Sequence, residues 1–442
     1  MAMVVKNNLS AKNTLNELNK NEKARTKNLK NLSTGMKINS AEDDASGYAI
    51  SEKMQTQIRS LSQDLDNTQT AMSMLKVAEG GVQSTVDILS TLKEKVINAA
   101  NDTNTDADRA IIQKELDQAV SQIDENANVM YNGKIVLDGS HNNEVNPATF
   151  TVLANESLDP NLGVLDNITD MCDSTGRSLG ILPDSRIEYS FVYQGETYTS
   201  VLDPVDTNIV QDMFALSRRP DGTYMATSSF ITADLNSTLG KDRTNTDVKT
   251  ANGNPALLFK ALQPGVDGQI AGLTINVVNK DGTINRTANS VLNDFHEAIR
   301  AENASPDNAL TFQIGTKANQ TVKMGFSDMR STALGLRAND GTNLSITTQK
   351  KANAAINVLE LAIGKALTLQ TSIGSVENRM NFTAANITTA NENTQATESI
   401  IRDADMAREM TAYTKNNVLV QASQSMLAQA NQNSSAVLSL LQ

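Results

Sequence analysis

Residues 4–36, VVKNNLSAKNTLNELNKNEKARTKNLKNLSTGM, carry the pattern from which the fold of this chain can be worked out. Positions spaced alternately by four and three residues hold seven apolar side chains out of ten in this stretch. Such spacing places the apolar side chains on one face of an α-helix, and Gly35 is a residue that ends helices well. The stretch therefore predicts an amphipathic helix that reaches about Thr34, and a helix of 30 residues is about 45 Å long.

The other end of the chain repeats this spacing between positions 406 and 441. Asn417, Gln424 and Asn431 recur every seven residues, and polar amides in a coiled-coil seam penalise slipped registers. A second apolar stripe on another face means that one partner helix cannot cover the whole surface, so several neighbours are needed. An ordinary bundle helix with polar seam positions is the alternative. The predicted seam consists of Leu15, Leu18, Leu29, Leu32, Met406, Met410, Tyr413, Asn417, Val420, Gln424, Leu427, Asn431, Leu438 and Leu441.

Proline and glycine separate the middle of the chain from its flanks. All eight prolines fall between positions 147 and 306, and glycine is missing from 82 to 132 and after 374. Both residues disfavour helix interiors, so the flanks are predicted to be helical. The expected inner helices span 45–98, with a soft break at Gly80-Gly81, then 104–129 and 320–399.

The middle segment shows a different pattern. Residues 187–193 alternate between apolar and polar side chains before a Gln-Gly turn, which is typical of a β-strand. Residues 273–278 are a second predicted strand, and a short helix is expected from Ser290 to Ile299. Before the middle segment, 135–137 is a predicted strand between two tight turns. The middle is therefore a mixed but β-rich domain.

Composition limits the classes of function. The chain has 442 residues with 38 basic and 50 acidic side chains, and this net charge of -12 disfavours nucleic acid or an anionic membrane as partner. Tryptophan is absent and the 7 tyrosines and 9 phenylalanines are few, which favours an extended molecule over a compact enzyme. The local charge of +6 in residues 1–40 fits a solvated helix face. No cleaved signal peptide and no membrane insertion are expected.

Catalytic and metal-binding patterns are incomplete. His296-Glu297 offers the first half of a helical zinc motif, but Arg300 occupies the place of the second histidine and cannot coordinate zinc. Cys172 has no nearby histidine to act as its base. We therefore expect that the chain is not an enzyme and binds no cofactor or metal. His296 is expected at the surface, near the end of a short helix.

The run of residues 32–47, LSTGMKINSAEDDASG, closely resembles the N-terminal signature of bacterial flagellins. The run that starts with IRDADMA at residues 401–407 and ends with VLSLL at 437–441 resembles the matching C-terminal signature. Two signatures at opposite ends are more specific than either alone. Within the first run, helix capping after Ser40 explains the acidic pair Asp43-Asp44 better than a metal site does.

The resemblance implies an α+β fold that agrees with the division above. A terminal α-helical coiled coil joins a long-helix packing domain with a β-hairpin, and a β-rich outer domain is inserted in the middle. The predicted segments are 1–44 and 400–442 for the two halves of the inner coiled coil, 45–146 and 307–399 for the two parts of the packing domain, and 147–306 for the variable outer domain.

The resemblance further implies a structural subunit that polymerises into the helical filament of the flagellum for swimming motility. Its ends are expected to be disordered alone and to fold on assembly, because they gain too little burial to offset ordering. It implies secretion by the flagellar type III apparatus to the extracellular filament, with copies of itself, an export chaperone, a cap protein and hook-associated junction proteins as partners. The strand near Ile135 resembles the family's β-hairpin, implicated in switching filament packing. The alternatives are a hook-filament junction protein and a flagellin with an enzymatic outer domain.

Flagellins also share a patch that the innate receptor Toll-like receptor 5 reads. Thr91 stands where an arginine is usual and Lys95 where a leucine is usual, so the resemblance implies weakened receptor binding. The alternative is that these side chains serve only solubility. The candidate patch consists of Thr91, Leu92, Lys93, Glu94, Lys95 and Glu115.

Overall fold

The structure is a computed structural model that describes residues 8–163, 165–205, 208–210 and 231–440. The chain forms two compact units, and each contains segments from both halves of the sequence. Unit 1 comprises residues 1–68, 313–320 and 382–442, and unit 2 comprises 69–312 and 321–381. The β-rich insertion therefore belongs to the same unit as the helical segments next to it.

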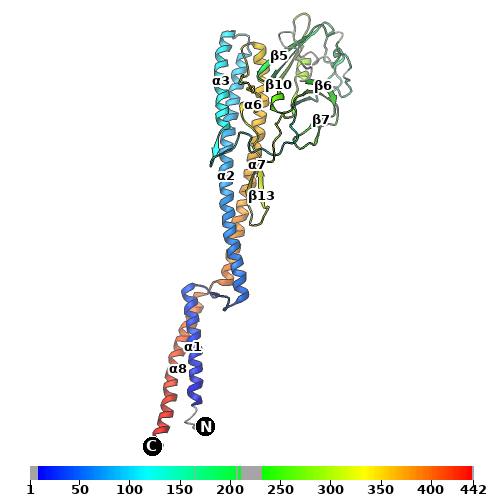
Figure 1. Cartoon of the computed structure of the whole chain (residues 1–442). Coiled ribbons are helices and arrows are strands. Elements are labelled where there is room, and N and C mark those ends of the chain that lie inside the picture. The colour runs from blue at the N-terminus through cyan, green and yellow to red at the C-terminus, as the bar shows by residue number, and fades with distance from the viewer. Residues whose placement is uncertain (1–7, 164, 206–207, 211–230, 441–442) are drawn as a thin grey trace. The chain divides into compact units, whose positions relative to one another are not determined.

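Helices account for the flanks of the chain, as predicted (Figure 1). The helices of the described residues are α1 (Leu9–Thr34), α2 (Ala45–Ala99), α3 (Asp106–Ala127), α5 (Arg286–Leu292), α6 (Ser331–Leu334), α7 (Gln349–Arg402) and α8 (Met406–Leu440), of which α5 lies in the middle segment. The first helix ends where the sequence indicates, because Gly35 adopts a left-handed φ of 73° and its N–H donates to the Asn31 carbonyl. Its start is capped by Asn8, whose side chain accepts from the Ala11 N–H.

In unit 2, α2 packs against α3 and α7 (Figure 1). The buried residues of α2 recur every three or four positions, which is the spacing of one helix face. They include Leu75, Ala78, Val82, Leu89, Leu92 and Val96. Polar pairs flank the packed face: Lys93 contacts Glu360 of α7 at 3.2 Å, and Lys95 contacts Glu115 of α3 at 3.2 Å.

Two expectations about helix continuity were wrong. Helix α2 runs through Gly80-Gly81 without a break. A Cβ atom on Gly81 would lie 2.8 Å from the Leu137 side chain, so close packing explains this glycine. The helix expected from 320 begins only at Gln349. The preceding residues form short strands, loops and α6, which are held to α3 because Asp124 accepts hydrogen bonds from the Ser331 N–H and hydroxyl and from Arg337.

The short helix expected from Ser290 to Ile299 was also wrong in part. Helix α5 ends at Leu292, and residues 296–299 form a strand that pairs with another strand of the insertion. The reason is a tertiary contact: the side chain of Asn293 accepts from the Ile275 N–H and donates to the Ile275 carbonyl, both at 2.7 Å. This asparagine takes the place of a neighbouring strand at the edge of the sheet.

The strands form small antiparallel sheets. They are β1 (Met130–Tyr131), β2 (Lys134–Ile135), β3 (Val152–Asn155), β4 (Arg186–Tyr193), β5 (Glu196–Leu202), β6 (Ile231–Asn236), β7 (Thr238–Lys241), β8 (Asp247–Lys249), β9 (Ala256–Ala261), β10 (Ile270–Val278), β11 (His296–Ile299), β12 (Leu310–Gln313) and β13 (Thr321–Met324). Their orders are β10-β4-β5, β11-β3-β9-β6, β7-β8, β12-β13 and β1-β2. The strands predicted at 187–193 and 273–278 are confirmed, and the 135–137 strand ends at Ile135.

The insertion has its own apolar core between its two larger sheets. Aromatic side chains occupy the centre, where the Phe191 ring of β4 lies 5.7 Å from the Phe259 ring of β9 and 5.7 Å from the Tyr198 ring of β5. Leu361 of α7 packs against the same cluster. The core therefore continues from the insertion onto the helix.

Strand β10 docks along α7. Gly272 sits at an irregularity of the strand with a φ of 66°, and the Asn357 side chain of α7 donates to the Leu273 carbonyl at 2.9 Å. Further along α7, the fully buried Lys365 contacts Glu297 of β11 at 3.5 Å and donates to the Ala333 carbonyl. These contacts make the insertion and α7 one packed body.

One helix of the described residues, α7, contains a window long and apolar enough to cross a membrane by length and composition alone. Half of that window is buried inside the protein. A buried core helix of this kind passes the same test.

Candidate assembly interface

Helices α1 and α8 lie side by side and antiparallel within unit 1 (Figure 1). Asparagine side chains connect the start of α1 with the far end of α8 and the end of α1 with the start of α8. Asn8 donates to the Ala430 carbonyl (3.2 Å), Asn21 to the Ser423 hydroxyl (3.3 Å), Asn416 to Asn28 (2.8 Å), and Asn28 and Asn31 to Glu409 (2.5 and 3.4 Å).

The predicted seam residues fall into two groups in the single chain. Leu18, Leu32, Tyr413, Asn417, Val420 and Leu427 are buried or half-buried. Leu15, Leu29, Met406, Met410, Gln424 and Asn431 are exposed. Leu438 lies in α8, and Leu441 lies outside the described residues. The pairing of α1 with α8 thus covers one face, and a role of the exposed group in contacts with other copies stays a prediction.

The asparagines of α1 were missed in the sequence. Asn21 and Asn28 lie outside the predicted stripe, but both face α8 and bond to it. Their separation by seven residues was the available signal, because polar residues at that interval in a helix point to one side.

The segment that follows α1, residues 35–44, pairs with the segment that precedes α8, residues 402–405. We call these two segments together the elbow. The Lys37 N–H donates to the Arg402 carbonyl, and the Ala404 N–H donates to the Gly35 carbonyl, each at 2.8 Å. These two bonds flank a bridge between Met36 and Asp403. The elbow therefore fastens the N-terminal link to the C-terminal link through backbone groups.

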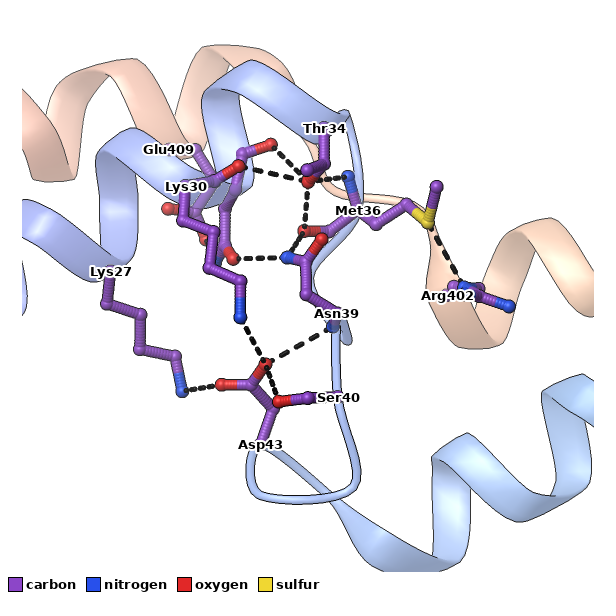
Figure 2. A network of polar contacts seen from close by, with 10 residues as sticks. Lys27, Lys30, Thr34, Met36, Asn39, Ser40, Asp43, Arg402 and Glu409 are labelled. Carbon is purple, nitrogen blue, oxygen red and sulfur yellow. Dashed lines mark hydrogen bonds and ion pairs between the residues drawn. The ribbon is translucent and has the colours of Figure 1, made fainter.

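Asp43 ties the elbow to α1 (Figure 2). Its carboxylate lies 3.0 Å from the Lys27 ammonium and 4.0 Å from that of Lys30, and it accepts from the Asn39 N–H at 3.2 Å. The hydrogen bond from Lys27, with smaller contributions from Asn39 and the positive charges, lowers the pKa of Asp43 below its usual value. Asp43 is therefore an ion-pair partner.

The expected capping after Ser40 was wrong in its assignment of residues. Asp44 caps α2, because its carboxylate accepts from the Ser46 and Gly47 N–H groups, each at 3.0 Å. The Ser40 hydroxyl instead donates to Asp43 at 3.4 Å.

Arg402 holds the other side of the elbow. Its guanidinium donates to Glu52 at 3.0 Å and to Ser51 at 3.2 Å. Its Nε contacts the Met36 sulfur at 3.1 Å (Figure 2). The same guanidinium lies 5.6 Å from the centre of the Tyr48 ring, within the range of a cation–π contact. One side chain thus joins the end of α7 to the elbow and to α2.

The candidate receptor patch lies along α2 and α3. Thr91 and Glu94 are exposed, Lys93 and Lys95 are partly exposed and engaged in the ion pairs described above, and Leu92 is buried. Thr91, Leu92, Lys95 and Glu115 line an open groove of about 290 Å³. Leu92 therefore supports the groove from inside, and the effect of this arrangement on receptor binding stays a prediction.

The residues considered for catalysis are dispersed. His296 is exposed on strand β11, not on a helix as expected, and its neighbour Glu297 pairs with Lys365. Cys172 is half-buried, and its thiol lies 3.5 Å from the Asp170 carbonyl oxygen. In the part of the chain that the structure describes, no three histidine, cysteine or acidic side chains gather in a way that could hold a metal ion.

Comparison with known proteins decides the family. The model of the bacterial flagellin N-terminal helical region matches residues 5–142, and that of the C-terminal helical region matches 356–441. A flagellin of Clostridium tyrobutyricum is 31% identical over 97% of this chain and 99% of its own length. The chain belongs to the bacterial flagellin family.

Other flagellins extend this match over the whole chain. A flagellin of Bacillus subtilis is 27% identical over 99% of this chain and 100% of its own. Among solved structures, FliC from Burkholderia pseudomallei covers 70% of this chain and 99% of its own at 17% identity and a TM-score of 0.26. The full-length relatives establish this flagellin as a structural subunit of the flagellar filament, which is extracellular. The junction-protein alternative is not better supported.

Proposed function

We propose that this filament subunit assembles through the two flanks of α8 that α1 leaves uncovered. We further propose that α1 and α8 become stably folded only when copies of the chain surround them. The observation that carries both proposals is the set of exposed apolar side chains on α8. Among the α8 side chains whose exposure the structure describes, the large ones are Met406, Met410, Val418, Leu419 and Met426.

The exposed side chains lie on both sides of the α1 contact. The residues of α8 that face α1 include Glu409, Asn416 and Val420. At about 100° per residue, Met406 and Met410 fall roughly 60° and 100° to one side of that line, and Leu419 and Met426 roughly 80° and 100° to the other side. A single partner helix cannot reach both flanks. Neighbouring copies on two sides of α8, as in a polymer, can cover both flanks.

The energetics agree with folding on assembly. Among the described side chains of α1 and α8, Val420 and Ala430 are the buried apolar ones. Ordering a residue costs about 1 to 2 kcal/mol, while fully burying one large apolar side chain contributes only about 1.5 to 3 kcal/mol. The helix pair alone is therefore marginal, and burial of the flanks by neighbouring copies adds the missing stabilisation.

The same surface supports the proposed partners. An exposed apolar α8 on an unassembled subunit invites unwanted association, which a chaperone that covers the helix during type III export would prevent. We extend the proposal to the cap protein and the hook-associated junction proteins as further partners of the same ends of the chain. We also propose that the chain binds Toll-like receptor 5 weakly and that it has no enzymatic activity. Thr91 and the Lys95–Glu115 ion pair support the former, and the dispersed His296 and Cys172 support the latter.

Seeded growth tests the proposal. Purified filaments are depolymerised by heat, mixed with short filament seeds, and inspected by electron microscopy. We expect seed-dependent growth by the full chain and none by a variant that lacks residues 402–442. Leu419→Asp should slow growth at least tenfold, whereas the control Leu419→Met, which keeps the flank apolar, should grow like the parent chain. Growth of the deletion variant at the parent rate contradicts the proposal.

A further inference from the structure

The methionines in the described part of this flagellin range from fully buried to largely exposed. Met171, Met329 and Met380 are fully buried, and Met74 and Met324 nearly so. Met36, Met54 and Met72 are intermediate. The large exposed ones are Met130 at 61%, Met406 at 48%, Met410 at 56% and Met426 at 62%. Among the methionines that the structure describes, three of these four therefore lie on α8.

Those three side chains occupy the surface on which assembly was proposed to depend. Met406 and Met410 lie on one flank of α8, and Met426 lies on the other. Leu419 shares the second flank and Val418 faces away from α1, so the exposed surface also contains aliphatic residues without sulfur. Oxidation of these three thioethers therefore changes the polarity of both flanks, while the neighbouring Leu419 and Val418 side chains stay unchanged.

The chemistry of a thioether makes this surface switchable. Hydrogen peroxide transfers one oxygen atom to the methionine sulfur: the O–O bond breaks, an S–O bond forms, and the remaining oxygen leaves as water. The sulfur is oxidised by two electrons and the peroxide is reduced by two. The product, methionine sulfoxide, is polar where the thioether was apolar, and a thiol-dependent reductase can reverse the change.

We propose that Met406, Met410 and Met426 form an oxidation site at which hydroperoxide blocks assembly of the unpolymerised subunit. This inference rests on the proposed assembly through the flanks of α8. A sulfoxide on a flank takes a strongly polar oxygen into a contact with apolar neighbours, which disfavours its burial. Copies already in a filament are protected, because their flanks are covered.

Peroxide treatment of the depolymerised full chain tests the site. Peptide mass spectrometry should find the mass increase of one oxygen, about 16 Da, at the three α8 methionines and at Met130, but not at Met171, Met329 or Met380. Seeded growth of the oxidised chain should be at least tenfold slower than that of the untreated chain. Methionine sulfoxide reductase with a dithiol should restore it.

A leucine variant separates this site from all other methionines. Met406→Leu/Met410→Leu/Met426→Leu keeps the flanks apolar, so it should grow on seeds and should continue to do so after peroxide treatment. Met130→Leu is the matched single control and should stay sensitive to peroxide. Growth of the oxidised parent chain at the untreated rate overturns the inference, and so does equal inhibition of the triple-leucine variant. Failure of the untreated parent chain to grow overturns instead the proposed assembly itself, so the two failures are distinguishable.

Discussion

Gly272 shows how one residue lets the insertion meet α7. Its φ of 66° lies in the region that glycine adopts without strain. A Cβ atom there would lie 2.6 Å from the Ala354 carbonyl oxygen and 2.6 Å from a Val358 methyl group. The close approach of β10 to the helix backbone therefore depends on the missing side chain.

We expect Gly272→Ala to lower the free energy of unfolding by about 2 to 4 kcal/mol, because it adds a steric clash to backbone strain. Urea unfolding followed by circular dichroism measures the change. Gly341→Ala is the matched control: its φ is 91°, but a Cβ atom there meets nothing within 4 Å. The control should cost only about 1 kcal/mol. Equal losses in the two variants would show that close packing at β10 contributes nothing.

Asp43 is the residue whose charge stabilises the elbow. Its folded-state pKa lies below the unfolded value of 3.8, so its stabilising contribution is present above that value and is lost as the pH falls through the lower folded-state pKa. Lys27 and Lys30 are more than half exposed, so water screens the pair.

In the assembled state Asp43→Asn should therefore destabilise the subunit by about 1 kcal/mol at pH 7 and by progressively less as the pH falls from 3.8 toward 2. Urea unfolding of parent and variant filaments, in which α1 is folded, between these pH values checks the trend. Lys27→Met, which removes the first partner of the carboxylate, should reproduce most of the loss at pH 7. A difference between parent and Asp43→Asn that stays constant with pH is the result that excludes the ion pair as the cause.

At the scale of elements, the contact between α7 and β11 depends on a buried ion pair. Burial lowers the pKa of Lys365 from 10.5 to about 8, against the opposing effect of Glu297. Arg300 further lowers this pKa, and Glu302 raises it. Since the unfolded chain binds the proton more tightly than the folded chain does, the cost of burying the charge is fully present below pH 8 and is relieved as the pH rises toward 10.5.

The stability of the parent chain relative to Lys365→Met/Glu297→Gln should therefore rise by about 2 to 3 kcal/mol between pH 8 and 10.5. Urea unfolding over this range measures the difference, and the comparison cancels other titrating groups. Lys365→Met alone should be less stable than the double variant at pH 7, because it leaves the Glu297 carboxylate buried without its partner. A stability difference that falls as the pH rises contradicts the assigned burial of the charged lysine.

At the scale of the whole molecule, burial is distributed unevenly. In unit 2, residues such as Leu75, Leu89, Val358 and Ala362 are fully buried. Helices α1 and α8 contribute few buried apolar side chains to unit 1 among the described residues. Regions with few buried contacts open at low free-energy cost.

Amide hydrogen exchange of the unpolymerised chain should therefore show fast exchange in α1 and α8 and slow exchange in residues 71–99 of α2 and 352–373 of α7. In filaments all four segments should exchange slowly. Strong protection of α1 and α8 in dilute, unpolymerised protein would contradict folding on assembly.

Much of the helical architecture could be read from local pattern. The 4,3 spacing and Gly35 predicted α1 and its end, and the alternation in 187–193 predicted β4. These features depend on residues close together in the chain, where the period of the side chains reports the backbone directly. The flagellin signatures likewise lie in continuous stretches at each end.

The tertiary structure decided the rest, because the deciding partners are distant in sequence. Gly81 occurs inside α2 because a side chain there would collide with Leu137, and Asn293 ends α5 because it bonds to Ile275. The asparagines of α1 form interhelical hydrogen bonds because α8 lies opposite them in the tertiary structure. By itself the sequence determined that the outer flanks are largely helical, that α1 ends at Gly35, and to which family the signatures point. Only the packing of remote segments decided which faces those helices bury, because burial depends on what lies across from a side chain and not on its neighbours in the chain.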